Sequence, residues 1–275
     1  MPQIFGSMKF PKMKVWLYEA PVNPERIIAY DYLKCISDDS YITPDQIPLD
    51  YACKIAEDVL NGGHTPALES INLLFGIDGI SKVVSHQIVR HRIGVSIGQR
   101  TQRANCEKYL GNFYHGKHYV LPPSVLKYWH SDQNCMQFEE YLEAAENLYN
   151  ELIEHGVPMD DARYIIPQAS ETSMSFKVIY KSLQMACSTR LCHMMQGEIV
   201  EIFRLMVKAV KDYNGLLGRY LKPICAITGK CNRNENNPDE NNPKGVCEYT
   251  VNGFIPVREY KSQINLTQYS KDNTI

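Results

Sequence analysis

The chain has 275 residues, of which 29 are Lys or Arg and 31 are Asp or Glu, giving a formal net charge of −2. Hydrophobic residues make up 44% of the sequence, which is enough for a folded core and excludes global disorder. The charge balance and the lack of a long basic stripe disfavour nucleic acid as a partner. This length favours one large domain.

The sequence also predicts a cytoplasmic protein. Charged and polar residues interrupt its most apolar stretch, residues 71–89, so we expect no membrane span. Its first residues lack the apolar run of a secretory signal. The 9 cysteines are scattered along the chain and odd in number, as is typical of reduced thiols. The spacing of Cys225, Cys231 and Cys247 matches no paired-ligand zinc pattern, so we predict no metal site.

The first half of the chain predicts one strand and several helices. Residues 13–18 predict a strand, residues 25–36 a helix, and residues 50–61 a helix that Gly62 and Gly63 stop. A loop rich in Ser, Asp and Pro connects those helices. A longer helix is predicted from about residue 68 to residue 92, because an apolar stripe recurs there at helical spacing: Ile77, Ile80, Val84 and Ile88.

The second half is interpreted in the same way. Residues 93–105 predict a loop or short strand because two glycines break the pattern. Residues 136–155 predict an amphipathic helix with Phe138, Leu142, Ala145, Tyr149 and Leu152 on one face. We expect a strand at 173–180, one or two helices over 182–221, and a domain over 1–222 followed by a partly flexible extension over 223–275.

Residues 85–103, SHQIVRHRIGVSIGQRTQR, concentrate the polar chemistry of the chain. On a continuous helix, His86, Gln87, Arg90 and His91 would share one polar arc. Gln87 suits a base edge, and guanidinium forks that point to different sides suit two anionic ligands. The alternative is an exposed helix end whose arginines pair with the acidic residues of 137–146.

Arg90-His91-Arg92, followed by a hydroxyl residue and an arginine, resembles the signature of the flavin-dependent thymidylate synthases. The resemblance extends in order over residues 13–222 and includes GGHTPALESINLLFGIDGISK, GVPMDDARYIIP and RLCHMMQGEI. It implies an α+β fold, a single domain whose central, mostly antiparallel sheet is flanked by long helices. It also implies a homotetramer with its sites where subunits meet. The implied reaction converts dUMP to dTMP with FAD as cofactor and with methylenetetrahydrofolate and NADPH as co-substrates.

The resemblance also implies roles for individual residues. Arg190 matches the arginine that contacts the uracil and is the implied catalytic residue. The implied dUMP-binding residues are Gln87, Arg90, Gln99, Arg100, Thr101, Arg103, Arg163 and Arg190. The implied FAD-binding residues are Thr65, Arg90, His91, Arg92, Gln99 and Lys181.

This chemistry does not require a cysteine nucleophile. Uracil C5 is a poor nucleophile, and a guanidinium at N3 and O2 stabilises negative charge as it develops on the ring. The hydride chemistry belongs to the flavin, while the protein supplies position and charge. We therefore interpret Cys187 and Cys192, which lie near Arg190 in the sequence, as packing thiols.

The sequence departs from the family pattern at several positions. The spacer after Arg92 is one residue longer, Thr101 replaces a serine, and Gln99 replaces a common glutamate. In the segment 179–185, an asparagine is lost and Lys181 replaces an arginine that contacts FAD. Three readings remain open: a thymidylate synthase, a relative that methylates UMP or hydroxymethylates dUMP, or a non-catalytic paralogue that binds nucleotide or flavin.

Overall fold

The computed structural model describes residues 2–36, 43–62, 64–101, 119–131, 135–192, 194–228, 249–250 and 253–254. The chain divides into two compact units, Met1–Lys222 and Pro223–Ile275, which are described separately. The predicted division into a family-like domain over 1–222 and an extension over 223–275 stays a prediction. None of the described helices is long and apolar enough to cross a membrane.

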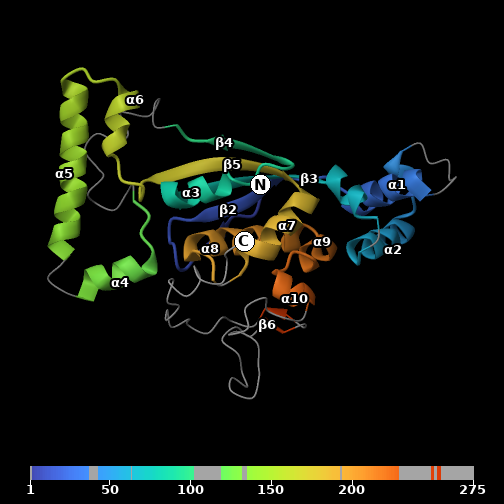
Figure 1. Cartoon of the computed structure of the whole chain (residues 1–275). Helices are drawn as coiled ribbons and strands as arrows, with labels where there is room; N and C mark the ends of the chain where they lie inside the picture. Colours follow the sequence, from blue (N-terminus) through green and yellow to red (C-terminus); the bar gives the residue numbers. More distant parts are fainter. Residues whose placement is uncertain are drawn as a thin grey trace, which may run out of the picture. The chain divides into compact units, whose positions relative to one another are not determined.

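A five-stranded sheet forms the centre of the first unit (Figure 1). The strand order is β1-β2-β3-β5-β4, and all the pairs are antiparallel. The predicted α+β fold with a central antiparallel sheet is therefore confirmed. The strands are β1 (Phe5–Gly6), β2 (Lys14–Glu19), β3 (Asn72–Ser81), β4 (Val95–Gln99) and β5 (Glu171–Ile179).

Helices pack against this sheet in the first unit, and their bounds agree with most of the predicted ranges. The segment 182–221, predicted as one or two helices, contains parts of three. The helices of the first unit are α1 (Pro24–Ile36), η1 (Pro44–Gln46), α2 (Leu49–Leu60), η2 (Thr65–Ser70), α3 (Lys82–Ile88), α4 (Pro123–Ser131), α5 (Cys135–Glu154), α6 (Met159–Ala162), η5 (Arg163–Ile165), α7 (Tyr180–Arg190), α8 (Gly197–Tyr213) and α9 (Gly215–Arg219). In the second unit, the described elements are α10 (Ile224–Thr228) and the antiparallel strands β6 (Tyr249–Thr250) and β7 (Gly253–Phe254).

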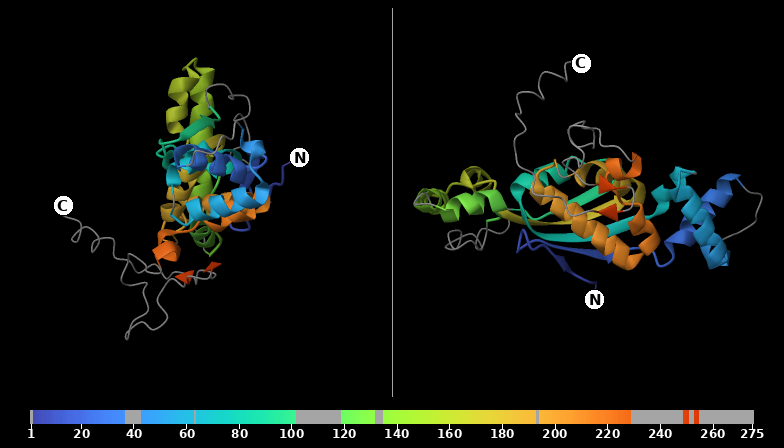
Figure 2. Two further views of the ribbon diagram at one scale, coloured as in Figure 1. Left: turned by 90° about the vertical axis from the view of Figure 1, so that its right-hand side faces the viewer. Right: turned by 90° about the horizontal axis from the view of Figure 1, so that it is seen from below.

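One face of the sheet forms the main core. The central strands pair Leu73 with Val178 and Phe75 with Phe176, and these four side chains are buried. The long amphipathic helix α8 packs in the same cluster through residues such as Phe203 and crosses the strands in Figure 2. Burying apolar side chains stabilises the fold by about 0.8 kcal/mol per CH₂ group, so this face is the main source of stability. Helix α8, which packs on this face, also contacts α3 and α7.

The predicted long helix from about residue 68 to residue 92 is wrong in its first half. Asn72–Ser81 is β3, which hydrogen-bonds to β2 on one side and β5 on the other. A bulge between Ile77 and Ile80 explains the error, because it buries both isoleucines at a spacing that imitates a helix. Gly79 supplies the positive φ of +68° within this bulge.

The predicted amphipathic helix at 136–155 agrees with α5, which forms a smaller second core. Leu142, Ala145 and Tyr149 are buried as predicted, and Leu152 is half-buried. Tyr149 and Leu142 pack with residues that include Ala162 of α6. The side chain of Phe138 lies outside the described part of the structure. This cluster holds α6 and the following η5, which carries Arg163, beside the end of the sheet.

Gly94 lies in the turn between α3 and β4 and requires glycine for two separate reasons. Its φ is +63°, and a Cβ there would lie 2.4 Å from Ile179 Cγ1 and 2.9 Å from Ser182 Oγ. Gly156 has a similar φ of +79°, but nothing lies within 4 Å of its Cβ position. A substitution at either glycine would strain the backbone, but only at Gly94 would the new side chain also clash with neighbouring atoms.

We predict that Gly94→Ala lowers the free energy of unfolding by about 2–3 kcal/mol, while Gly156→Ala lowers it by about 1 kcal/mol. The difference reflects the displacement of Ile179 and Ser182 by the new methyl group. Urea denaturation of both variants measures it. Equal losses would contradict the crowding at Gly94.

Candidate functional site

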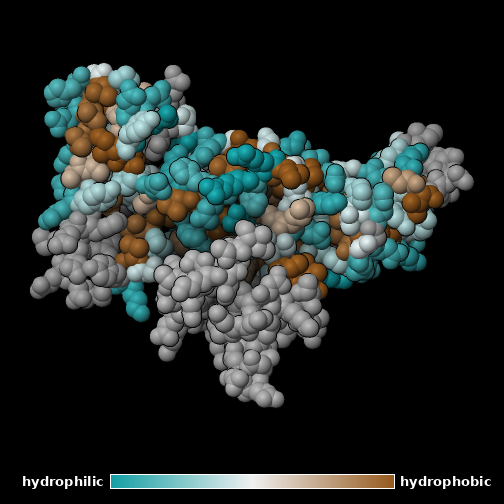
Figure 3. Space-filling model, viewed as in Figure 1, coloured by the Kyte–Doolittle hydropathy of each residue, from teal (hydrophilic) through white to brown (hydrophobic). Residues whose placement is uncertain are grey.

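The Arg90-His91-Arg92 motif lies in a turn, not in a helix. Helix α3 ends at Ile88, and the His91 N–H donates to the Ile88 carbonyl oxygen at 3.0 Å as the chain turns. The prediction that His86, Gln87, Arg90 and His91 share one helical arc is therefore wrong, because only the first two are helical. Figure 3 shows hydrophilic and hydrophobic residues side by side on this face of the molecule.

Arg190 and His91 meet at the ends of α7 and α3. The Arg190 Nε–H donates to His91 Nε2 at 3.1 Å, although 99 positions separate them in the sequence. The His91 ring also lies 5.8 Å from the Phe203 ring of α8, measured between centroids. Because the guanidinium can only donate, Nε2 is the acceptor and His91 is neutral. Burial, and then the charge of Arg190, lower the pKa of His91 and favour this neutral form.

Arg90 places a second positive charge beside Arg190. Burial, and then the charge of Arg90, lower the pKa of the Arg190 guanidinium. Among the described residues, neither arginine forms an ion pair, and nor does the exposed Arg92. The alternative in which these arginines pair with acidic residues of 137–146 finds no support in the described side chains of that helix. Arg190 is half-buried and lacks a carboxylate partner among the described residues, while Arg90 and Arg92 are exposed, so this group is a candidate for binding an anion.

A second polar group lies at the other end of α7. The Lys181 Nζ donates to Thr65 Oγ1 at 3.1 Å and lies 3.4 Å from Glu69 Oε1. These contacts join the first turn of α7 to η2. Since a helix rises about 1.5 Å per residue, Lys181 lies about 14 Å along the axis from Arg190. Nine residues at about 100° each also rotate the chain by about 180°, so the two groups lie on opposite sides of α7 as well as at opposite ends.

Gln99 and Arg100, at the end of β4, face different surroundings. The Gln99 Nε2 donates to Ser85 Oγ at 2.9 Å and to Thr172 Oγ1 at 3.5 Å, so its amide ties β4 to α3 and β5. Arg100 lines a cleft of about 590 Å³ on the sheet face opposite the main core, together with Trp16 and Tyr18. Thr101 follows and is exposed.

Arg100 belongs to a third group, which includes a residue that the sequence analysis missed. Burial, then Arg163, then Arg100 lower the pKa of Lys82, so three positive charges lie within electrostatic reach of one another. Arg163 pairs with Asp160 at 3.3 Å. The missed signal is the basic residue that follows Ser81, where the family run GIS-R also has a basic residue.

Seven of the predicted site residues fall into three local groups, together with Glu69 and Lys82. The contacts described above for these residues lie within the three groups. Gln87 is in none of them and is half-buried in the last turn of α3. Arg103 lies outside the described residues, as do Cys231 and Cys247. Among the residues that the structure describes, no cluster of three or more His, Cys, Asp or Glu could hold a metal ion. The groups are Arg90, His91 and Arg190; Thr65, Glu69 and Lys181; and Lys82, Arg100 and Arg163.

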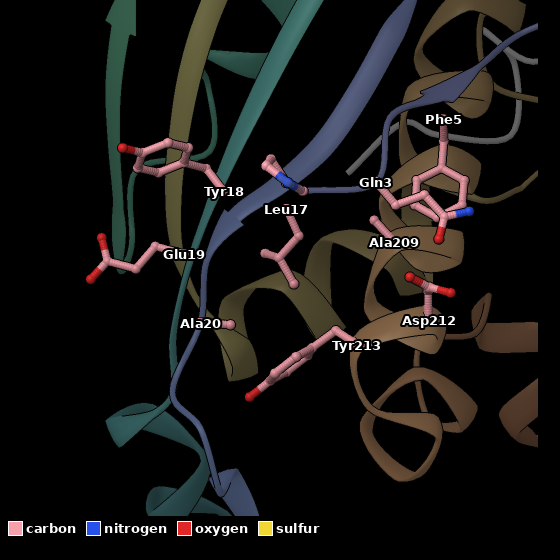
Figure 4. Close-up of a pocket in the computed structure, with 10 residues that line it drawn as sticks. Gln3, Phe5, Leu17, Tyr18, Glu19, Ala20, Ala209, Asp212 and Tyr213 are labelled. Carbon is pink, nitrogen blue, oxygen red and sulfur yellow. The ribbon is translucent and has the colours of Figure 1, made fainter.

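Cys187 and a second cleft lie apart from the chemistry of the predicted site residues. Cys187 is fully buried, and burial raises the pKa of its thiol, which makes it unsuited to act as a nucleophile. A cleft of about 360 Å³ lies where β2 and the N-terminal residues meet α8 (Figure 4). Phe5, Leu17, Asp212 and Tyr213 line it, and no predicted site residue does.

Comparisons with known proteins identify the family. The family model described as thymidylate synthase complementing protein matches residues 17–213. A flavin-dependent thymidylate synthase of Geobacter sulfurreducens is 34% identical over 173 residues, covering 63% of this chain and 70% of the relative. That of Saccharolobus solfataricus is 35% identical over 179 residues, or 65% of each chain. The chain therefore belongs to the thymidylate synthase complementing protein family, and the predicted resemblance is confirmed.

Solved structures agree with this assignment at the level of the fold. The crystal structure of thymidylate synthase X from Helicobacter pylori with FAD and dUMP has a TM-score of 0.58 and 21% sequence identity. The match covers 76% of this chain and 99% of that chain. The sheet and its surrounding helices are thus those of this family.

The neutral state of His91 predicts a dependence of stability on pH. An unfolded histidine binds its proton near pH 6.5, and folding lowers the pKa of His91 below that value. Between the two pKa values, the unfolded chain holds more protons. Stability from this residue is therefore complete above about pH 6.5 and is lost as the pH falls through the folded pKa.

Glutamine at position 91 can still accept a hydrogen bond from Arg190 but cannot take up a proton. We therefore predict that the free energy of unfolding falls by about 1 kcal/mol less in His91→Gln than in the wild type between about pH 7.5 and 5.5. Chemical denaturation at several pH values measures the effect. His86→Gln is the matched control, because His86 is exposed on the preceding helix and the variant should keep the wild-type profile. Identical profiles for wild type and His91→Gln would contradict the assigned neutral state.

Proposed function

We propose that this protein is a flavin-dependent thymidylate synthase that methylates dUMP at C5, with methylenetetrahydrofolate as one-carbon donor, NADPH as reductant and FAD as cofactor. Family membership supports the general reaction. The single observation that carries the assignment to particular residues is the group formed by Arg90, His91 and Arg190. It offers positive charge, unpaired among the described residues, where an anionic nucleotide could bind.

Arg190 has the properties that ring activation needs. Its guanidinium is half-buried, is held through Nε by the neutral His91, and has its terminal nitrogens free of acid partners among the described residues. A cation held in this way stabilises negative charge that develops on the uracil ring. Because this stabilisation increases as charge develops, it favours the transition state over the bound substrate. His91 acts by orienting the guanidinium.

The residues present fit FAD. Arg90 and Arg92 are exposed guanidinium groups without acid partners among the described residues, as a pyrophosphate requires. The family resemblance assigns Thr65 and Lys181 to FAD as well, although they lie at the other end of α7 and on the opposite side of the helix from Arg190. Once reduced by NADPH, the flavin would supply the hydride. Gln99 would hold the end of β4 through Ser85 rather than donate its amide to the ligand.

The remaining predicted residues would hold the nucleotide. Gln87 would pair with the base through its amide, and Thr101 would donate a hydroxyl hydrogen bond. Arg100 and Arg163 belong to a cationic group that suits the phosphate. Arg103 follows Thr101 in the family pattern and would complete this set.

We also propose that the enzyme is a cytoplasmic homotetramer with its sites at subunit interfaces. The turn that carries Arg92 is exposed and continues into the apolar Ile93, which is 79% exposed in the single chain. Val89 on the same turn is also exposed. Apolar side chains around a functional motif suit an interface better than a surface facing water.

An absorption spectrum of the purified protein, followed by mass spectrometry of products, tests the reaction. We expect a flavin spectrum and dTMP from dUMP when methylenetetrahydrofolate and NADPH are supplied. A modified ribonucleotide from UMP, or a hydroxymethyl product, would move the assignment to the related reactions and make Thr101 and the 179–185 segment determinants of specificity. Flavin binding without turnover would favour a non-catalytic paralogue. A protein that cannot be loaded with FAD would overturn the proposal.

We predict that Arg190→Ala lowers kcat/KM for dUMP at least about 100-fold, because it removes charge stabilisation in the transition state. Cys187→Ala should keep kcat while losing about 1–2 kcal/mol of stability through a small core cavity. Steady-state kinetics and denaturation of both variants measure these effects. If Cys187→Ala abolished turnover while Arg190→Ala preserved it, the assigned chemistry would be wrong.

A further inference from the structure

Glu198, in the first turn of α8, is a buried carboxylate with an unusual set of partners. Its side chain is only 2% exposed. Oε1 accepts the backbone N–H of Ser81 at 2.7 Å, and Oε2 accepts the Ser81 hydroxyl at 2.6 Å. Both donors belong to Ser81, so the carboxylate holds the backbone and the side chain of that residue at the same time.

This arrangement is a poor source of stability. Burial raises the pKa of the Glu198 carboxyl, and hydrogen bonds from Ser81 and Gln196 only oppose that effect. No cation pairs with Glu198 among the described residues. The N-terminal end of α8 favours a negative charge but seldom outweighs full burial. A buried carboxylate that adds little to the stability of the fold is better explained by the residues that it positions.

Ser81 is the residue at which β3 becomes α3. It is the last residue of the strand and the N-cap of the helix, and its hydroxyl accepts the Val84 N–H at 3.2 Å. Helix α3 has 7 residues and leads directly into the turn that carries His91. In so short a helix, a change at the N-cap is transmitted to the C-terminal end. The placement of Gln87 and His91 therefore depends on where Ser81 is held.

Helix α8 contacts both ends of this short helix. Glu198 holds its start through Ser81, and the Phe203 ring packs against His91 just beyond its end. Gln196, which caps α8 by accepting the Ile199 N–H at 3.1 Å, follows Arg190 by a short connection. One rigid helix thus sets the positions of α3 and of the segment that leaves Arg190.

We propose that Glu198 is a positioning residue of the nucleotide site: through Ser81 and α3 it fixes Gln87 and His91 opposite Arg190. The proposal rests on the proposed function, since it assigns Glu198 to the site that binds the uracil nucleotide. Glu198 itself contacts neither substrate nor cofactor. Its role is to keep the hydrogen bond between His91 and Arg190 in register with the base-binding amide of Gln87.

Glu198→Gln is the informative substitution, because it keeps the shape of the side chain. The carbonyl oxygen can still accept the Ser81 N–H and the amide nitrogen can donate to the Ser81 hydroxyl, but both hydrogen bonds lose the negative charge of the carboxylate and are weakened. Glu201→Gln is the matched control. It makes the same change one turn later in α8, where Glu201 accepts from Ser7 Oγ at 2.9 Å and pairs with Arg204 at 3.7 Å, away from α3.

The experiment combines NMR titration of His91 in the full chain with dUMP binding measured by calorimetry on the flavin-loaded protein. For Glu198→Gln we expect the His91 pKa to rise toward its ordinary value, because the contact with Arg190 loosens. The dissociation constant for dUMP should increase about tenfold, since small misplacements of binding groups have large effects. Glu201→Gln should match the wild type in both measurements, and denaturation of each variant should show that it is folded.

Two further results decide the matter. Ser81→Ala removes both the hydrogen bond to Glu198 Oε2 and the N-cap of α3, so its effect should be at least as large as that of Glu198→Gln, and the double variant should be no worse than Ser81→Ala alone. If Glu198→Gln left both the His91 titration and dUMP binding at wild-type values, or if Glu201→Gln changed them equally, the positioning role would be overturned. If the wild-type protein failed to bind dUMP, the proposed function would fail instead, while the His91 titration would still test the link to α3.

Discussion

Two positive charges, Arg90 and Arg190, lie close together at the candidate site, and the rest of the site depends on elements that hold them there. The charge of Arg90 helps to lower the pKa of the Arg190 guanidinium, so their proximity gains nothing in the folded chain alone. Elements with large apolar interfaces must hold them together. The neutral ring of His91 accepts a hydrogen bond from one guanidinium without cancelling its charge, which leaves the positive potential available to a ligand.

The sheet brings these groups together by geometry. β3 and β5 are antiparallel neighbours, with Ser81 opposite Glu171 at one end and Asn72 opposite Ile179 at the other. Helix α3 therefore starts at one end of the pair and α7 at the opposite end. A strand pair of this length spans about 30 Å, while α7 and α3 advance about 16 Å and about 10 Å along it. The ends of the two helices meet over the middle of the sheet, where α8 supports both.

This geometry explains which features could be predicted from the sequence. The ordered motifs of the family were visible, because each is a local run of residues. The β3 strand was misassigned because its bulge buries Ile77 and Ile80 at helical spacing, and only pairing with β2 and β5 resolves the ambiguity. Lys82 and Glu198 were missed for a related reason. Their roles depend on residues about 80 and 117 positions away, which local patterns do not reveal.

The electrostatics of α7 also bear on the departures from the family pattern. Lys181, which replaces an expected arginine, is paired with Glu69, whereas Arg190 at the other end of the helix has no acid partner among the described residues. A lysine bound to a carboxylate presents less net charge and no planar fork. The altered segment of the proposed enzyme would therefore weaken one contact far from the reacting ring, while the end of α7 that would face the uracil keeps its charge. In the proposed enzyme, the departures at 179–185 act on cofactor affinity rather than on the chemical step.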